Sequence, residues 1–197
     1  MRSGRGALAT LVLGLVAALA PAAPAAADAP TPTNYRSEVL EVDPAPPAEV
    51  TIEVVGGDSF LELRTAGPRV EVPDYGGDTL YLRFEPDGTV WRNERAVATA
   101  ANEDRFGATD ATPDPDAAPV WEQVADDGAF AWHDHRIHWM SPSTPQAVDE
   151  DGRVDLGGPD GRWEVPITVD GTDTIVVGQL WLEPGPPLWP TVVATSA

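Results

Sequence analysis

Proline, glycine and aspartate interrupt this chain so often that long helices have little room to form. The sequence holds 21 Pro and 18 Gly in 197 residues, and between them lie short runs in which apolar and polar residues alternate. Alternation with a period of two is typical of half-buried β-strands, whereas an amphipathic helix needs a period of about 3.6 residues. The pattern therefore predicts an all-β fold.

Three pairs of alternating runs are joined by residues that favour tight turns. Similar runs at 35–42 and 130–133 bring the total to about eight strands. Because antiparallel strands of this kind each bury one face, we expect an antiparallel immunoglobulin-like sandwich. The three pairs are residues 50–55 with 60–64 around Gly56-Gly57-Asp58, 79–84 with 89–93 around 85–88, and 163–169 with 174–182 around Asp170-Gly171.

Two long loops interrupt the strand pattern. Residues 102–119 are rich in Asp, Pro and Thr, and residues 141–161 form a second loop. Residues 96–101 are compatible with one helical turn. Loops of this length on a rigid scaffold are common places for binding residues, so the segment between the two loops is of particular interest.

The first 27 residues have the three parts of a Sec-type signal peptide. Arg2 and Arg5 give a positive start, residues 7–20 are apolar, and 25–27 are alanines that suit a cleavage site. The apolar run is short for a membrane span. We therefore expect an exported protein, secreted or at the cell surface, that begins near Asp28. The predicted organisation is signal peptide 1–27, linker 28–34, β-sandwich domain 35–183 and Pro-rich tail 184–197.

The chain is strongly acidic and contains no cysteine. Its formal net charge is −20, and loss of Arg2 and Arg5 with the signal peptide would make it more negative. Such a surface repels nucleic-acid phosphates and anionic lipid head groups, so no nucleic-acid partner is expected. The absence of cysteine excludes thiolate catalysis, cysteine-based zinc sites and iron–sulfur clusters. Stability must therefore come from a packed core.

All three histidines of the chain fall in one short segment, 132–139, and one of only two methionines follows at position 140. If residues 131–135 continue as a strand, His133 and His135 point to the same face. His138 and Met140 share the same two-residue spacing. A turn at 134–137 would fold the second pair over the first.

This ligand set predicts a metal site. Thioether and imidazole together suit copper, because Met favours Cu(I) and His favours Cu(II). Three histidines without the methionine would instead resemble a zinc site with an open position. Asp134 is a candidate to orient an imidazole or to ligate directly. The predicted ligands are His133, His135, His138 and Met140, with copper ahead of zinc.

A purely structural interpretation competes with metal binding. Trp132, Ile137 and Trp139 are ordinary core residues, and imidazoles between them can serve as hydrogen-bonded packing groups. Arg136 would repel a bound cation unless its guanidinium points away. The acidic composition also leads us to expect imidazolium, with the pKa of the histidines above the usual value of about 6.5.

Two other candidate sites are weaker. Residues 149–155 have the acidic spacing of a calcium loop. However, Arg153 and Val154 occupy positions 5 and 6, where an EF-hand loop has a ligand and an invariant glycine. Ser141 and Ser143 lie beside the histidines, which leaves a Ser/His/Asp triad open. The sequence has no Gly-x-Ser-x-Gly elbow and no phosphate-binding glycine loop. We therefore predict no catalytic residues and no enzyme activity.

Five stretches, residues 34–37, 81–88, 93–95, 131–140 and the ending from 163 through 190, together resemble a group of uncharacterised exported actinobacterial proteins. The resemblance covers nearly the whole chain after the predicted cleavage site, and it implies no established activity. It implies a signal peptide, one extracytoplasmic β domain with a Trp-His-Asp-His-Arg-x-His-Trp-Met block, and a C-terminal membrane helix. Only seven residues follow Pro190, too few to span a bilayer, so we expect the anchor to be lost or truncated here.

These observations predict a secreted or cell-surface accessory or interaction domain that binds copper through the histidine and methionine cluster. The alternative is a non-catalytic domain that binds another envelope protein and whose His/Trp cluster is purely structural. Neither interpretation includes a membrane span after signal cleavage. Burial and ring orientation distinguish the two, because ligands must converge on one point whereas packing groups need not.

Overall fold

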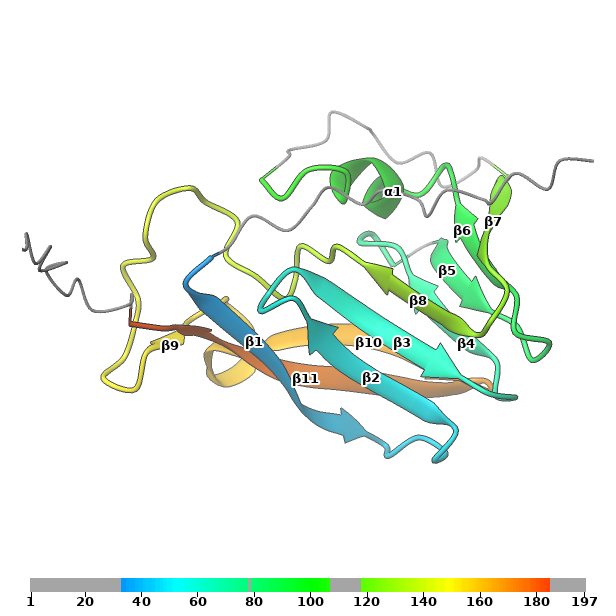
Figure 1. Ribbon diagram of the computed structural model, residues 1–197, viewed down its shortest axis with the longest axis horizontal. Helices are drawn as coiled ribbons and strands as arrows, with labels where there is room; N and C mark the ends of the chain where they lie inside the picture. Colours follow the sequence, from blue (N-terminus) through cyan, green and yellow to red (C-terminus); the bar gives the residue numbers. More distant parts are fainter. Residues whose placement is uncertain (1–32, 78, 107–117, 185–197) are drawn as a thin grey trace, which may run out of the picture.

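The computed structural model describes residues 33–77, 79–106 and 118–184 (Figure 1). These residues are mostly antiparallel β-sheet with very little helix, which confirms the all-β prediction. The predicted signal peptide, residues 28–32 of the linker and residues 185–197 of the Pro-rich tail lie outside the described residues, as do residues 107–117 of the first long loop. Among the described residues, no helix has the length and apolar character needed to cross a membrane.

Two antiparallel sheets make up the described structure. The larger contains eight strands and the smaller three. The larger sheet has the order β1 (Tyr35–Asp43), β11 (Thr172–Leu182), β10 (Trp163–Val169), β4 (Val70–Pro73), β5 (Leu80–Phe84), β6 (Val90–Asn93) and β7 (Trp121–Ala125), with β9 (Arg153–Val154) paired to β11. The smaller sheet has the order β2 (Val50–Val55), β3 (Phe60–Thr65) and β8 (Ala129–Trp132).

All three predicted strand pairs are present. β2 pairs with β3, β5 with β6, and β10 with β11, each in antiparallel register. The β10–β11 turn has positive φ at both Asp170 (47°) and Gly171 (80°). Two consecutive positive φ values match the twist of the flanking strands, and Asp-Gly is a favoured pair at these positions. The turn residues thus fix the register of the longest hairpin.

The sequence pattern missed three strands. β4 and β9 are so short that they contain at most two cycles of alternation, and β7 follows the Pro-rich loop without a clear periodic signal. The second long loop is therefore not without structure, because it contains β9 and a 3-10 turn at Pro159–Gly161. The single helical turn expected near residue 97 is present as α1 (Val97–Ala101).

One core lies between the two sheets. Trp163 at the start of β10 is almost fully buried, and its Nε1 donates a hydrogen bond to Ser37 Oγ on β1 at 2.8 Å. Gly178 makes room for this indole, since a Cβ at that position would lie 1.9 Å from Trp163 Cζ2. Core residues from both sheets include Leu61, Leu63, Val72, Leu82, Phe84, Trp132, Val165 and Ile167.

Candidate metal centre

The histidine segment begins where β8 ends. β8 covers Ala129–Trp132, close to the predicted strand 130–133, so the continuation to residue 135 that would place His133 and His135 on one strand face does not occur. The chain instead turns, and the Ile137 N–H donates a hydrogen bond to the Asp134 carbonyl at 3.2 Å. The expected turn over 134–137 is therefore confirmed. It brings His138 back toward His133.

Asp134 organises this turn from a fully buried position. Its carboxylate accepts hydrogen bonds from Trp132 Nε1 at 2.8 Å and from the Arg136 backbone N–H at 3.0 Å. The Arg136 guanidinium completes the set through Nε at 2.8 Å and Nη2 at 2.7 Å. These bonds come from Trp132 and Arg136, and within the described structure none joins Asp134 to an imidazole, so the arrangement does not support the expectation that it orients a ring. Its carboxylate stabilises the turn through hydrogen bonds to Trp132 and Arg136.

The charges of this pair compensate each other. Burial alone would raise the pKa of Asp134, but the Arg136 charge and the hydrogen bonds to the carboxylate hold that pKa below its ordinary value. The Arg136 guanidinium also lies over the Tyr75 ring, 5.0 Å from its centroid. The Arg136 guanidinium thus forms an ion pair with Asp134 and a cation–π contact with Tyr75. The repulsion that argued against a metal site is correspondingly reduced.

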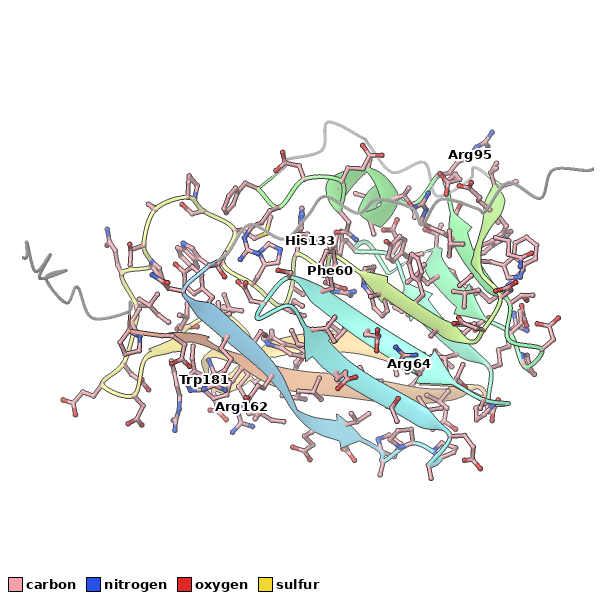
Figure 2. The ribbon with its side chains drawn as sticks, in the orientation of Figure 1. Phe60, Arg64, Arg95, His133, Arg162 and Trp181 are labelled. Carbon is pink, nitrogen blue, oxygen red and sulfur yellow. The ribbon has the colours of Figure 1, made fainter. Side chains whose placement is uncertain are left out.

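The three imidazoles converge. The ring centroids of His133 and His138 are 4.4 Å apart, and each lies 5.5 Å from that of His135. One ring nitrogen from each histidine lies within 4.8 Å of the other two, and no other group of three such ligands occurs in the described part of the chain. Figure 2 shows His133 beside Phe60, whose ring meets the imidazole edge-on with centroids 6.0 Å apart.

Backbone carbonyls engage one nitrogen of His135 and one of His138. His138 Nδ1 lies 3.3 Å from the Trp139 carbonyl oxygen, and His135 Nε2 lies 2.9 Å from that of Asp104. The Ser59 backbone favours the protonated form of His133 and so raises its pKa against the larger, opposite effect of burial. A carbonyl oxygen can only accept, so each bonded nitrogen carries the hydrogen, and the other nitrogen of a neutral ring carries the lone pair.

Two ring nitrogens of the cluster are buried and unsatisfied. Nε2 of His133 and Nε2 of His138 have no hydrogen-bond partner within the described structure. The His138 side chain is only 1% exposed. Metal-binding histidines commonly donate their second N–H to a carbonyl or carboxylate, which fixes the tautomer and leaves the lone pair for the ion. The arrangement around His138 has that form.

The histidines are neutral in the folded chain. Burial lowers the pKa of His138 to about 3, with further contributions from His133 and Arg105. Burial also lowers the pKa of His133 and of His135. The expectation that the acidic composition raises these values is wrong, because desolvation of the rings outweighs the attraction of nearby carboxylates. Neutral imidazole is the form that binds metals.

Residues distant in sequence complete the surroundings. Arg105 contacts the fully buried Asp58, whose other carboxylate oxygen accepts a hydrogen bond from Thr33 Oγ1 at 2.8 Å. The Tyr75 hydroxyl accepts the His135 backbone N–H at 2.9 Å. Sequence analysis missed all of these residues. Only Asp58 gave any signal, and that signal was for a hairpin turn.

Met140 lies beside the cluster at a pocket of about 590 Å³. His135 and His138 line this pocket together with Trp139, Met140 and Ser141. The Met140 side chain is 38% exposed, so it lies on the solvent side of the buried imidazoles. Its role as a ligand stays a prediction.

No family model, curated protein or solved structure matches this chain. The resemblance to exported actinobacterial proteins therefore stays an expectation, and the chemistry of the site has to be argued from its own geometry.

The two weaker candidate sites lack the expected contacts. Ser141 Oγ and Ser143 Oγ lie 2.8 Å apart and bond each other, with no bond to a histidine in the described structure. In the acidic loop, Asp149 Oδ1 accepts the backbone N–H groups of Asp151 and Arg153, each at 2.9 Å. Neither the triad nor the calcium loop is assembled. The histidine cluster is the stronger candidate.

Proposed function

We propose that this domain binds a transition-metal ion, copper in the first place, through His133, His135 and His138. The observation that carries the proposal is the convergence of three neutral imidazoles, two with buried and unpartnered Nε2 atoms. A buried acceptor without a partner costs about 1–3 kcal/mol. An ion that binds these lone pairs would remove this cost.

The spacing of the ring nitrogens suits a single ion. When three atoms all lie within 4.8 Å of one another, some point lies within about 2.8 Å of each. Bonds from imidazole nitrogen to zinc are about 2.0–2.1 Å long, and those to copper are similar. Small side-chain rotations would shorten the distance from each nitrogen to the ion from about 2.8 Å to the length of a metal–nitrogen bond. Backbone hydrogen bonds to the opposite ring nitrogens of His135 and His138 would guide those rotations.

The choice between copper and zinc depends on Met140. As the fourth ligand, its thioether would favour Cu(I). Three imidazoles alone would also hold Cu(II) or Zn²⁺ with one position open. Met140 follows His138 by two residues and lines the same pocket as His135 and His138, which supports its inclusion in the ligand set. We therefore place copper ahead of zinc.

The setting that we propose for this centre is an exported domain at the cell surface with an accessory role and no enzyme activity. The apolar run and the alanines before Asp28 support export. Within the β-fold, we propose an immunoglobulin-like sandwich, supported by two antiparallel sheets that share one core. Export is tested by detecting the mature protein outside the cytoplasm, with an amino terminus near Asp28.

The test of metal binding is a titration of the purified protein with Cu(II), with Cu(I) under reducing conditions, and with Zn²⁺. We expect one ion per chain, with loss of binding in the His133→Ala/His135→Ala double variant. Met140→Leu should weaken Cu(I) binding and leave Zn²⁺ binding unchanged, because a thioether is a soft ligand. No binding of any ion, with loss of thermal stability in the double variant, would make the cluster structural and refute the proposal.

A further inference from the structure

The three histidines differ in how they face the neighbouring pocket. The ring of His133 meets Phe60 edge-on, and His133 does not line the pocket of about 590 Å³. His135 and His138, by contrast, both line it. An ion held by all three rings would therefore have His133 on the side away from the pocket. Its remaining coordination position would face the pocket.

The wall of this pocket is apolar next to the histidines. Trp139, Met140, Leu156 and Trp163 all line it, together with the half-buried Ser141. A volume of several hundred cubic ångströms is in the range of small-molecule sites, which combine apolar walls with a few polar groups. The pocket is thus large enough for a ligand with an aromatic body.

The charges at the pocket disfavour an anionic ligand. Asp155 and Glu164 line it together with Arg162, and no ion pair of Arg162 occurs among the described residues. Arg136 also lines the pocket, but it is paired with Asp134. The chain as a whole has a formal charge of −20. A neutral donor therefore fits this environment better than an anion.

We propose that the centre, when it holds a divalent ion, binds an external neutral nitrogen ligand with an aromatic body at the position facing the pocket. This inference rests on the proposed function. Met140 does not block the position in the divalent state, because thioether sulfur is a poor ligand for Cu(II) or Co(II) compared with imidazole. The ligand's nitrogen completes the coordination, and its ring packs against Trp139 and Met140.

The test uses the Co(II)-loaded protein, whose visible absorption reports the number and type of ligands at the ion. Imidazole, 4-phenylimidazole and azide are titrated separately. We expect 4-phenylimidazole to bind about 10-fold more tightly than imidazole, because its phenyl group is removed from water in the pocket. Azide, which carries a negative charge and no aromatic body, should bind more weakly than either.

Two tryptophan variants test the location. Ser141→Trp places a large side chain at a residue that lines the pocket and should weaken 4-phenylimidazole binding about 10-fold without changing Co(II) affinity. Thr144→Trp, at an exposed position that does not line the pocket, is the matched control and should change neither. An equal effect of the two variants would overturn the proposed location.

The outcomes separate this inference from the proposed function. Co(II) binding with a spectrum that none of the three ligands alters would leave the metal centre standing and overturn the inference. Equal affinities for imidazole and 4-phenylimidazole would also overturn it, since the pocket would then contribute nothing. Failure of the protein to bind Co(II), Cu(II) or Zn²⁺ would refute the proposed function and this inference with it.

Discussion

The histidine turn, residues 133–138, and the acidic loop, residues 149–155, both place several metal-ligand residues close together in sequence. They differ in what satisfies the ligand atoms. In the acidic loop, an Asp149 carboxylate oxygen accepts two backbone N–H groups, and the Asp151 side chain is 72% exposed. In the histidine turn, backbone carbonyls engage one nitrogen of His135 and one of His138, and the Nε2 atoms of His133 and His138 stay buried without partners in the described structure.

The difference shows that the type and spacing of residues do not define a site. Carboxylates that accept hydrogen bonds from their own loop, or that face water, gain little from an ion. A buried nitrogen lone pair without a partner costs stability until something binds it. The unsatisfied atoms, more than the residue types, distinguish the two segments. Four experiments can break or sharpen this comparison.

The largest effect is expected from Asp134→Ala in the histidine turn. This change leaves the partly buried Arg136 guanidinium and the Trp132 indole N–H without their acceptor. Breaking a buried ion pair by removing one partner costs about 3–5 kcal/mol. The free energy of unfolding, measured by urea denaturation, should fall by that amount.

Asp151→Ala in the acidic loop is the matched control for Asp134→Ala. Its ion pair with Arg153 is solvent-exposed, so the free energy of unfolding should change by less than about 0.5 kcal/mol. Asp134→Asn keeps one acceptor oxygen and should lie between the two, which gives a measurable value if Asp134→Ala does not fold. Similar losses for Asp134→Ala and Asp151→Ala would contradict the structural role given to Asp134.

Metal affinity should separate the two segments next. His138→Gln removes one of three ligands and should lower copper affinity by about 100-fold or more, since even changes outside the ligand set cost about 10–100-fold. The Asp149→Asn/Asp151→Asn double variant should leave copper affinity unchanged. Competition with a chromophoric chelator measures both. A large loss in the acidic-loop variant would mean that its carboxylates contribute to the site.

The sequence predicted local features of the fold better than distant ones. The turn at Asp170-Gly171 was predictable because its backbone conformation depends on those two residues. The clustering of His133 and His138 was predictable because they are close in sequence. The Arg105–Asp58 contact was not, since it joins residues 47 positions apart through the packing of a loop on a hairpin.

The pKa of the histidines was mispredicted for a related reason. Composition gives the net charge of the chain, but the pKa of a ring depends on its own burial and its nearest charges. Burial is the largest cause for His133, His135 and His138 alike, and Arg105 acts in the same direction. Neither could be read from the sequence before the fold was known.

The low pKa of His138 predicts how stability depends on pH. The folded chain binds a proton at His138 only near pH 3, whereas an unfolded histidine does so near its usual value of 6.5. Between these values the unfolded chain binds more protons, so the free energy of unfolding falls as the pH falls from about 6.5 toward 3. From pH 7 to pH 5 this contribution is about 2 kcal/mol for the metal-free protein.

The matched comparison is the difference between wild type and His138→Leu across this pH range, measured by urea denaturation in the presence of a chelator. The variant should lose about 2 kcal/mol less than wild type on going from pH 7 to pH 5. The Asp149→Asn variant should follow the wild-type curve over the same range. Parallel curves for wild type and His138→Leu would show that His138 is not buried as a neutral ring.

The smallest effect is also the one that best distinguishes a binding site from a packing cluster. Leu is similar to His in volume but has no polar atom, so His138→Leu removes the unpartnered Nε2 at the loss of one long hydrogen bond to the Trp139 carbonyl. At pH 7.5 without metal, we expect the variant to be more stable than wild type by about 1 kcal/mol. A purely structural role for His138 predicts the opposite sign.

With copper at about 100 times its dissociation constant, wild type should gain about 2.7 kcal/mol and become the more stable of the two. Thermal denaturation with and without copper measures this reversal, and a variant that is less stable under both conditions would assign His138 to the packing of the core.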